Sequence, residues 1–391
     1  MLETAADHNS TQCSTRMILR SISKEPSMSA NNIHVELWNL RVPLVPPIQA
    51  PKGAVTETCL LLVFVADDKG NRGVGYASFR KAADMDQATT VARKLVTESD
   101  RELAGLVTLA GLLNVERQQE MTCEGNHTSR SAASAISLAA WDLAGKQAGV
   151  ACADLWGRPS GRDSLDCYAS ALWLDKSPAE LIAEAKMHRQ NNYRAVKMRV
   201  SRSLADNLER IAAVCQVYAE PGTVALETGS DWTAAIANEF LDACNAKLMW
   251  VEDPEAHDKI HLVRDHPVNG IAAGEKSTHA RELYDLFTRG RLRKLIIDVQ
   301  YIGGPVRFLE AARILTALGA TVGGHRFSHY SLHLLAALPR SLPIEMLDWT
   351  NPAFYPLAGP NVSGRLPVEG PGFHIVLDQA VIDRHGVKLP L

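Results

Sequence analysis

The chain has 391 residues, of which 46% are hydrophobic and 22% are charged, and its formal net charge at pH 7 is -3. This length exceeds what one ordinary hydrophobic core needs and suits two packed domains of a globular protein. The small net charge gives no reason to expect nucleic acid or a membrane surface as a partner, so an acidic ligand would need a local basic site.

The sequence has no apolar stretch long enough to cross a bilayer, and its start lacks the apolar core of a signal peptide. Its seven cysteines are scattered without a CxxC pair, which is typical of reduced thiols. We therefore expect a cytoplasmic protein. Residues 1–30 are polar and show no periodicity, so we expect a disordered lead.

The next region, residues 31–160, predicts an α+β domain. Alternating apolar and polar residues indicate strands, and turn residues separate them. The predicted β-meander consists of a strand at Ile33–Arg41, a proline-rich loop at Pro43–Pro51, a strand at Thr58–Ala66, a turn at Asp67–Asn71 and a strand at Val74–Ala77. Residues 82–155 then show helical spacing of Ala and Leu.

From Asp166 onward, short apolar strands alternate with amphipathic helices. We predict eight strands: Tyr168–Leu174, Ala195–Val200, Val224–Thr228, Met249–Asp253, Ile271–Glu275, Leu295–Val299, Val322–His325 and Ile344–Trp349. Strands that are separated by helices pair in parallel and are buried on both faces. Eight such units in about 200 residues predict a (β/α) barrel, whose active site lies at the carboxyl ends of its strands.

Two of the intervening helices carry clear local signals. Ser177-Pro178-Ala179-Glu180 is a capping box with proline at the first helical position. The next helix places Leu208, Ile211, Cys215 and Tyr218 on one face. Gly303-Gly304-Pro305 predicts a tight turn into a helix rather than a phosphate loop.

Charged side chains interrupt the apolar strands at or near their carboxyl ends. They are Lys197, Arg199, Glu227, Glu252, Asp253, Glu275, Asp298, His325 and Glu345. Structural ion pairs would explain one or two of these residues, because burying an unpaired charge costs several kcal/mol. Structural ion pairs explain a full ring of nine such residues poorly, since the mouth of a barrel directs these residues toward a common centre.

Glu227, Glu252 and Glu275 come from three successive strands, and a cation between them would relieve their repulsion. Oxygen-only ligands select a hard ion, which points to Mg²⁺. Lys197 and Arg199 are two residues apart on one strand and therefore point to the same face. Beside a metal they could hold a substrate carboxylate or move a proton.

A different metal site is also conceivable. His325, His329 and His333 are spaced by four residues and would share one face of a helix, as in a Zn²⁺-dependent hydrolase. We favour a place for His325 at the strand end, with His329 and His333 in helix packing.

The ordered motifs along the chain resemble the mandelate racemase branch of the enolase superfamily over nearly all of residues 33–380. The matching segments are Ala139–Lys146, Ala195–Arg199, Val251–Pro254, Gly274–Glu275, Ile297–Gly304, Gly324–Phe327 and Ile344–Asp348. The resemblance implies a modified TIM barrel of the (β/α)7β type at residues 161–354. It also implies an N-terminal α+β capping domain at residues 31–160, against which residues 355–391 pack.

The resemblance further implies roles for the residues at the strand ends. Glu252 and Glu275 would bind Mg²⁺, which grips the substrate carboxylate while a base removes the α-proton. His325 would be the general acid/base, with Asp298 orienting its imidazole. Glu345 would donate a hydrogen bond to the substrate carboxylate and would therefore be protonated.

The third strand departs from the family pattern of Asp-x-Asn. It ends in Glu227-Thr228-Gly229, and Glu is one methylene longer, about 1.5 Å. We expect Glu227 to be the third metal ligand, with Asp231 as the alternative. Because of this departure, a second interpretation stays open, in which the chain is a non-catalytic descendant of the family with a damaged metal site.

The second strand departs from the Lys-x-Lys of the racemases, because Arg199 stands in the second position. Arginine stays protonated and is a poor general base. We therefore expect a lyase with one mobile base, which dehydrates an acid sugar to a 2-keto-3-deoxy acid. A racemase or epimerase of an α-hydroxy acid is the alternative.

The expected partner is a small-molecule carboxylate. Its identity would depend on capping-domain loops around Val45–Thr56 and Phe79–Asp86, which would close over the barrel mouth. The family resemblance also implies a homo-oligomer, either a dimer or an octamer.

Overall fold

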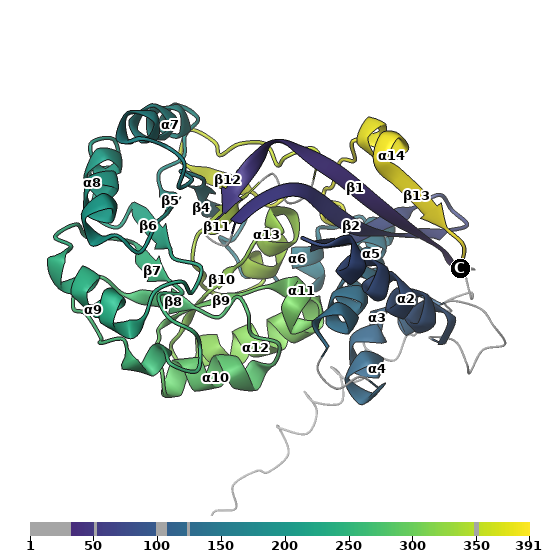
Figure 1. Ribbon diagram of the computed structural model, residues 1–391. Helices are drawn as coiled ribbons and strands as arrows, with labels where there is room; N and C mark the ends of the chain where they lie inside the picture. Colours follow the sequence, from purple (N-terminus) through teal and green to yellow (C-terminus); the bar gives the residue numbers. More distant parts are fainter. Residues whose placement is uncertain (1–32, 51–52, 99–107, 123–125, 348–351) are drawn as a thin grey trace, which may run out of the picture.

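The computed structural model describes residues 33–50, 53–98, 108–122, 126–347 and 352–391. The predicted disordered lead, residues 1–30, lies outside them. The chain forms a β-sheet domain with long helices beside a barrel of short parallel strands (Figure 1). No helix within these ranges combines the length and apolarity that a bilayer span requires. The five cysteines inside them are free thiols.

The N-terminal sheet has four antiparallel strands in the order β13-β1-β2-β3. They are β1 (Ile33–Ala50), β2 (Gly53–Asp67), β3 (Arg72–Phe79) and β13 (Gly386–Leu389). The predicted proline-rich loop at Pro43–Pro51 was wrong where the structure describes it, because β1 continues to Ala50 and pairs there with β2. Beyond Leu40 no other strand of the described residues pairs with the second edge of β1, so prolines are tolerated there.

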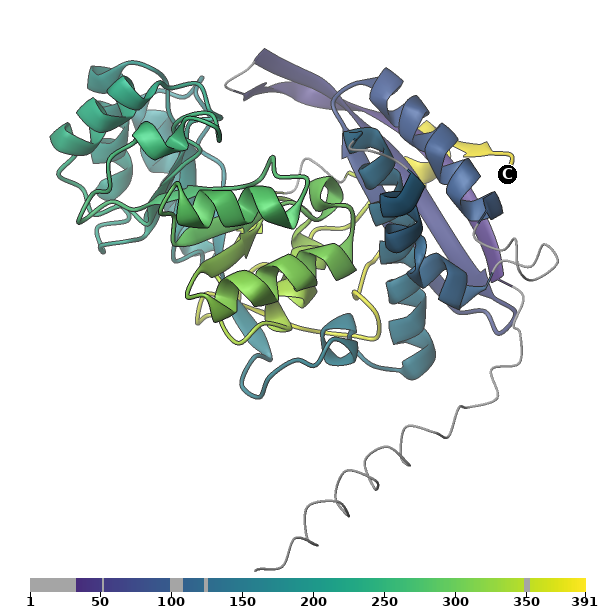
Figure 2. The same ribbon diagram turned by 90° about the horizontal axis from the view of Figure 1, so that it is seen from below.

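The two longest helices of this domain pack on the sheet, and three shorter helices pack against the longer of the two (Figure 2). They are α2 (Ala82–Glu98), α3 (Leu109–Leu113), α4 (Val115–Thr122), α5 (His127–Ala148) and α6 (Cys152–Leu155). Helix α5 lies so close to β3 that a Cβ at Gly73 or Gly75 would come within 2.1 Å of a backbone carbonyl of the helix. Only glycine fits at these two positions.

The second sheet contains all eight predicted barrel strands, paired in parallel in the order β10-β9-β8-β7-β6-β5-β4-β11. They are β4 (Ser164–Ser170), β5 (Val196–Arg199), β6 (Val224–Glu227), β7 (Trp250–Glu252), β8 (Ile271–Ala273), β9 (Lys294–Ile297), β10 (Thr321–Gly324) and β11 (Ile344–Met346). A hydrogen bond from Leu342 N to Val322 O, 2.8 Å long, joins the two ends of the sheet.

Helices connect most of these strands on the outside of the barrel. They are α7 (Pro178–Gln190), α8 (Leu204–Cys215), α9 (Ala234–Ala243), α10 (Ala280–Thr288), α11 (Val299–Ile302), α12 (Pro305–Ala317) and α13 (Ser328–Ala336). Between β7 and β8, where every residue is described, the connection has only the 3-10 turn η1 (Ile260–Leu262) in place of an α-helix.

The local signals largely held. The capping box at Ser177 and Glu180 is present, and Pro305 opens α12 after the Gly-Gly turn. Tyr218 was wrongly placed on the preceding helix, because α8 ends at Cys215. The hydroxyl of Tyr218 donates instead to the Tyr193 carbonyl at 3.0 Å, which fixes the loop that follows the helix.

The C-terminal segment returns from the barrel to the N-terminal sheet. Strand β12 (Arg365–Pro367) pairs with β4 of the barrel, whereas β13, after α14 (Gln379–His385), pairs with β1. Figure 1 shows α14 and β13 beside β1, at the far end of the molecule from α8 and α9. The chain thus links both domains at its C-terminal end as well as through α6.

Candidate metal and acid-base site

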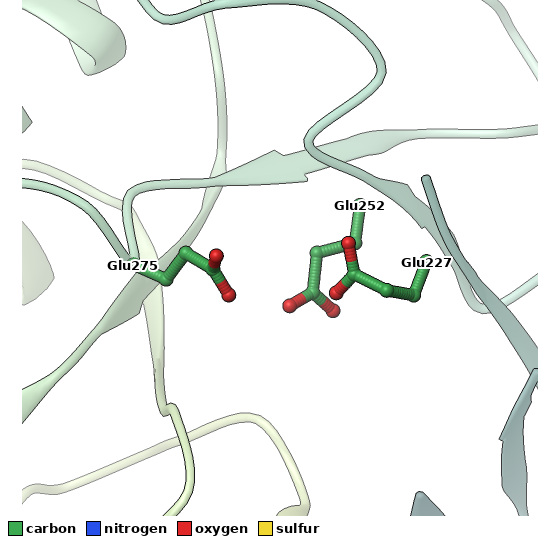
Figure 3. A group of neighbouring side chains, drawn as sticks. All are labelled: Glu227, Glu252 and Glu275. Carbon is green, nitrogen blue, oxygen red and sulfur yellow. The ribbon is translucent and has the colours of Figure 1, made fainter. Parts of the chain in front are cut away.

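Three glutamates meet at the carboxyl ends of β6, β7 and β8. Each of Glu227, Glu252 and Glu275 offers an oxygen within 4.8 Å of the others, and their carboxylates face one another in Figure 3. Parallel strands end at the same edge of the sheet, so residues that are far apart in the sequence converge there. Among the residues of the described ranges, this is the one group of three acidic or metal-binding side chains so arranged.

Glu227 and Glu252 are buried and Glu275 is partly buried, and the three carboxylates repel one another. Burial, together with the neighbouring charge of Glu252, raises the pKa of Glu227 well above its ordinary value. Burial also raises the pKa of Glu252. A site of this kind is stabilised by a cation, and a donor set made only of carboxylate oxygens suits a hard divalent ion such as Mg²⁺. The residues present therefore fit the expected metal.

Lys197 supplies one positive charge at the same place. Its Nζ lies 2.9 Å from Glu252, 3.5 Å from Glu227 and 2.8 Å from Glu345. Burial lowers the pKa of Lys197, but Glu252 and Glu345 outweigh burial and raise it well above its ordinary value. The side chain is therefore a fixed ammonium between the three strands β6, β7 and β11.

The structure separates the two acidic candidates at the end of β6. Glu227 lies in the cluster, and its Oε1 accepts a hydrogen bond from Gly229 N at 2.6 Å. Asp231 instead pairs with Arg202 near the surface, with the closest oxygen 2.7 Å from Nη2. The longer glutamate side chain thus folds back toward its own backbone, and Gly229 lines the pocket beside it. The alternative of Asp231 as the ligand has no support in this geometry.

His325 follows β10 and lies between two carboxylates. Its Nδ1 is 2.7 Å from Asp298 Oδ2, and its Nε2 is 3.0 Å from Glu275. Burial alone would lower the pKa of His325, but Glu275 and Asp298 raise it well above its ordinary value. The Asp298 carboxylate thus orients the imidazole so that the other ring nitrogen faces the metal-binding cluster.

Arg326 is a third member of this arrangement, which the sequence did not reveal. Its Nη2 donates to the same Asp298 oxygen at 2.9 Å. Burial raises the pKa of Asp298, but Arg326 and His325 outweigh it and lower this pKa below its ordinary value. The only available signal was that Arg326 directly follows His325 at a strand end.

The backbone places Asp298 by capping a helix. Its Oδ1 accepts from Gln300 N at 2.8 Å and from Tyr301 N at 3.1 Å, at the start of α11. The predicted sixth strand therefore stops at Ile297, and Val299 belongs to the helix. A capping aspartate satisfies the free N–H groups of a helix start, which outweighs the β propensity of Val299.

The predicted protonation of Glu345 does not agree with its contacts. Its oxygens accept hydrogen bonds from Ser170 Oγ at 2.6 Å and Arg326 N at 2.8 Å, and Lys197 lies at 2.8 Å. Burial raises the pKa of Glu345, but Lys197 and other nearby cations lower it to about 2. The carboxylate is therefore ionised and acts as an acceptor rather than a donor.

Three contacts fix the side chain of Arg199. Its Nη1 donates to Ser170 Oγ at 2.9 Å and to the Ala171 carbonyl at 3.3 Å. Its guanidinium carbon lies 4.1 Å from the centre of the Trp173 ring. The group is a fixed cation at the pocket edge.

The three spaced histidines do not form a metal site. His329 is buried and bonds to the Tyr355 carbonyl at 3.2 Å, and His333 packs edge-on against Phe373 with ring centres 5.3 Å apart. Burial lowers the pKa of His329 to about 4 and that of His333 to about 3. Helix α13 begins after His325, so the three side chains cannot share its face.

A pocket of about 410 Å³ opens above these groups. Its lining residues come from both domains and are Ser78, Phe79, Arg80, Lys81, Asp84, His127, Trp173, Arg199, Glu227, Gly229, Glu275, Lys276, Tyr301, His325, Arg326 and Leu347. The predicted capping segment Phe79–Asp86 contributes to this lining. The described residues of the other predicted segment, Val45–Thr56, do not. Lys276, Tyr301 and His127 were also missed, and only Lys276 had a signal, as the neighbour of Glu275.

Two family descriptions match the chain. Residues 180–381 match the domain described as "Enolase C-terminal domain-like", and residues 32–157 match "Mandelate racemase / muconate lactonizing enzyme, N-terminal domain". Together they span both the barrel and the N-terminal sheet domain.

Individual proteins are more distant. The chain is 25% identical to the L-talarate/galactarate dehydratase of Salmonella typhimurium over 80% of each chain. It is 26% identical to the 3,6-anhydro-alpha-L-galactonate cycloisomerase of Streptomyces coelicolor, over 86% of this chain and 94% of the other. Among solved structures, an L-talarate dehydratase from Polaromonas sp. JS666 in complex with Mg and L-glucarate has a TM-score of 0.77 at 23% identity. That superposition covers 92% of this chain and 99% of the other. This last likeness establishes the fold.

Proposed function

Because the chain belongs to the enolase superfamily, in its mandelate racemase and muconate lactonizing enzyme branch, we propose that it is a Mg²⁺-dependent acid-sugar dehydratase. It removes the proton next to the carboxylate of an aldonate or aldarate and yields a 2-keto-3-deoxy acid. One observation carries this proposal. The site has a single oriented histidine, His325, and at the position where the racemases have a second base it has a fixed cation, Arg199. One mobile acid/base suits elimination better than racemisation.

Glu227, Glu252 and Glu275 would hold the metal, which supplies positive charge beside the substrate carboxylate. Lys197 lies against the same carboxylates and would stabilise the negative charge that grows on the substrate as its α-proton leaves. The replacement of aspartate by Glu227 does not remove a carboxylate from this group, which weighs against a damaged metal site.

His325 is the group that would take the α-proton. Its Nδ1 is fixed by Asp298, and its Nε2 faces the pocket, where it pairs with Glu275 at 3.0 Å. A cation held by Glu275 would compete with this pairing, lower the pKa of His325 and leave Nε2 to the substrate. The proton that His325 receives could then be passed to the β-hydroxyl, which leaves as water. In this reaction the C–H bond at the α-carbon and the C–O bond at the β-carbon both break, and the enol that remains becomes the 2-keto acid.

Racemisation or epimerisation is the alternative for the same site. It would need a second group that exchanges a proton on the opposite face of the substrate, and Arg199 remains protonated and engaged with Ser170 and Trp173. The cycloisomerase among the relatives is similar over nearly its full length, so the scaffold itself does not decide between the reactions.

The decisive experiment is proton NMR in D₂O with the protein, Mg²⁺ and a library of aldonates and aldarates. A dehydratase removes the α-signal of its substrate and produces a 3-deoxy methylene. Deuterium exchange or epimer formation without that methylene would instead identify a racemase. No reaction with any member of the library would refute the proposed function, provided that the protein binds Mg²⁺ and is folded.

A further inference from the structure

The wall of the pocket that comes from the N-terminal domain carries two cations and an imidazole. Arg80 and Lys81 directly follow β3, and His127 is the first residue of α5. Asp84 is the one carboxylate that this domain contributes to the described lining. These residues lie across the pocket from the barrel-strand ends that hold the metal-binding carboxylates and Lys197.

The other cations of the pocket already have partners. Lys276 pairs with Asp253 at 2.9 Å, and Arg326 pairs with Asp298 at 2.9 Å. Arg80 and Lys81 are different, because neither has an ion pair or a side-chain hydrogen bond with any residue that the structure describes. Asp84 is close in sequence but forms no ion pair with either cation. The positive charge of this wall is therefore unmatched within the described protein.

This wall is also held in a fixed position over the barrel. Gln300, two residues after Asp298, bonds to both the N–H and the carbonyl of Ser78, at 2.9 and 3.1 Å. The ring of His127 lies edge-on to Tyr301, with centres 5.3 Å apart. Two contacts to α11 thus tie the cationic wall to the helix that Asp298 caps, so its place relative to His325 is set by packing.

We propose that Arg80 and Lys81, with His127 beside them, bind a second carboxylate at the far end of the substrate. The inference rests on the proposed function and narrows it, since the substrate is then a dicarboxylic acid sugar, an aldarate, rather than an aldonate. One carboxylate lies by the metal-binding cluster and Lys197, and the other meets the two cations that the described protein leaves unpaired.

The physical reason is the difference between the two substrate classes at this end. An aldonate ends in a hydroxyl group, so Arg80 and Lys81 would lose water on binding without gaining a counter-charge. An aldarate ends in a carboxylate, which can form charge-assisted hydrogen bonds with the guanidinium. Because both cations are exposed in the free protein, solvent screens part of the gain, and we expect a preference of about tenfold or more.

The test compares substrates that differ only at the terminal carbon, D-glucarate with D-gluconate and galactarate with galactonate. For the wild-type protein with Mg²⁺, kcat/KM should be at least about tenfold higher for the reactive diacid than for its matched monoacid. Arg80→Met and Lys81→Met should each lower kcat/KM for the diacid more than for the monoacid, so that the ratio of the two values falls toward one. Arg80→Lys should restore part of the preference.

The matched control is Lys94→Met, which removes one positive charge from an exposed position on α2 that does not line the pocket. It should leave the preference unchanged. Calorimetric binding of the two substrates to His325→Asn, with and without Arg80→Met, gives a readout that does not depend on turnover. The diacid should bind more tightly only while Arg80 is present.

Three outcomes separate the inference from the proposed function. Equal turnover of diacid and monoacid, or an equal loss for both in Arg80→Met, would overturn the second-carboxylate site and leave the dehydratase standing. A clear preference for 6-phosphogluconate over glucarate would assign the wall to a phosphate and overturn the aldarate. Absence of turnover for every acid sugar would remove both the proposed function and the inference.

Discussion

The side-chain amide of Gln300 pairs with the backbone of Ser78, accepting from its N–H at 2.9 Å and donating to its carbonyl at 3.1 Å. Both residues are buried, and they are 222 residues apart in the chain. This contact joins the end of β3 to the start of α11, and so it sets the capping-domain wall of the pocket against the Asp298–His325 pair.

Removing this amide should loosen the wall. Gln300→Ala leaves the N–H and the carbonyl of Ser78 buried without partners, which should lower the free energy of unfolding by about 3 kcal/mol. We also expect kcat/KM to fall about tenfold or more, because Arg80 and Lys81 lose their fixed place. Denaturant unfolding and steady-state kinetics measure the two effects. Gln147→Ala removes a hydrogen bond that the side-chain amide of Gln147 donates to Asp67 away from the pocket, so it should lower stability without changing kinetics. Equal kinetic losses in both variants would contradict this role of Gln300.

His325 should be essential for proton removal. His325→Asn should lower the rate of α-proton exchange by at least about a thousandfold, since general bases contribute about 10²- to 10⁴-fold and no second base is available at Arg199. Exchange is followed by NMR in D₂O, and Mg²⁺ binding is followed by calorimetry. Metal binding should persist, because the three glutamates are unchanged. Retained exchange in this variant would exclude His325 as the base.

Metal removal tests the glutamate cluster. Chelation should abolish turnover, and added Mg²⁺ should restore it. Mg²⁺ at a hundred times its dissociation constant should stabilise the fold by about 2.7 kcal/mol, visible as a rise in Tm. Glu252→Gln and Glu227→Gln should weaken this rise. Asp231→Asn is the control, because Asp231 pairs with Arg202 outside the cluster. A loss of the Mg²⁺ effect in Asp231→Asn, with Glu227→Gln unaffected, would reverse the assignment of the third ligand.

A buried carboxyl outside the pocket should make stability depend on pH. Glu116 accepts from Ser137 Oγ at 2.5 Å and from Arg307 N at 3.0 Å, at the start of α12. Burial outweighs these bonds and raises its pKa from 4.5 to about 7. A raised pKa in the folded state favours folding at low pH, so this contribution is complete below pH 4.5 and is lost as the pH rises through 7.

The expected loss is roughly 3 kcal/mol between pH 4.5 and pH 8, because a pKa of about 7 in the folded state replaces 4.5 in the unfolded chain. Urea unfolding at several pH values measures it as the difference between the wild-type protein and Glu116→Gln. Glu310→Gln, which changes an exposed glutamate on α12, should not alter the pH profile. A profile of Glu116→Gln that runs parallel to the wild type would show that Glu116 does not titrate in this range.

Much of the fold was accessible from the sequence because it depends on local patterns. Apolar runs separated by helical periods gave all eight barrel strands, and the capping box at Ser177 and Pro305 after its two glycines gave two helix starts. The predicted boundaries of strands were wrong where a contact with another part of the chain decides the local structure. Pairing with β2 kept Pro43 within a strand, and capping by Asp298 drew Val299 into a helix.

The sequence by itself determined which chemistry the barrel mouth could hold, because parallel strands of one sheet all end at the same edge. Placing Glu227, Glu252, Glu275 and His325 at strand ends was enough to predict that they converge. Only the tertiary structure decided the charge state of Glu345, the third contact of Asp298 with Arg326, and the cationic wall of Arg80 and Lys81. These depend on distances between side chains from different strands and domains. Such distances are set by how the two domains pack, which no local pattern along the chain records.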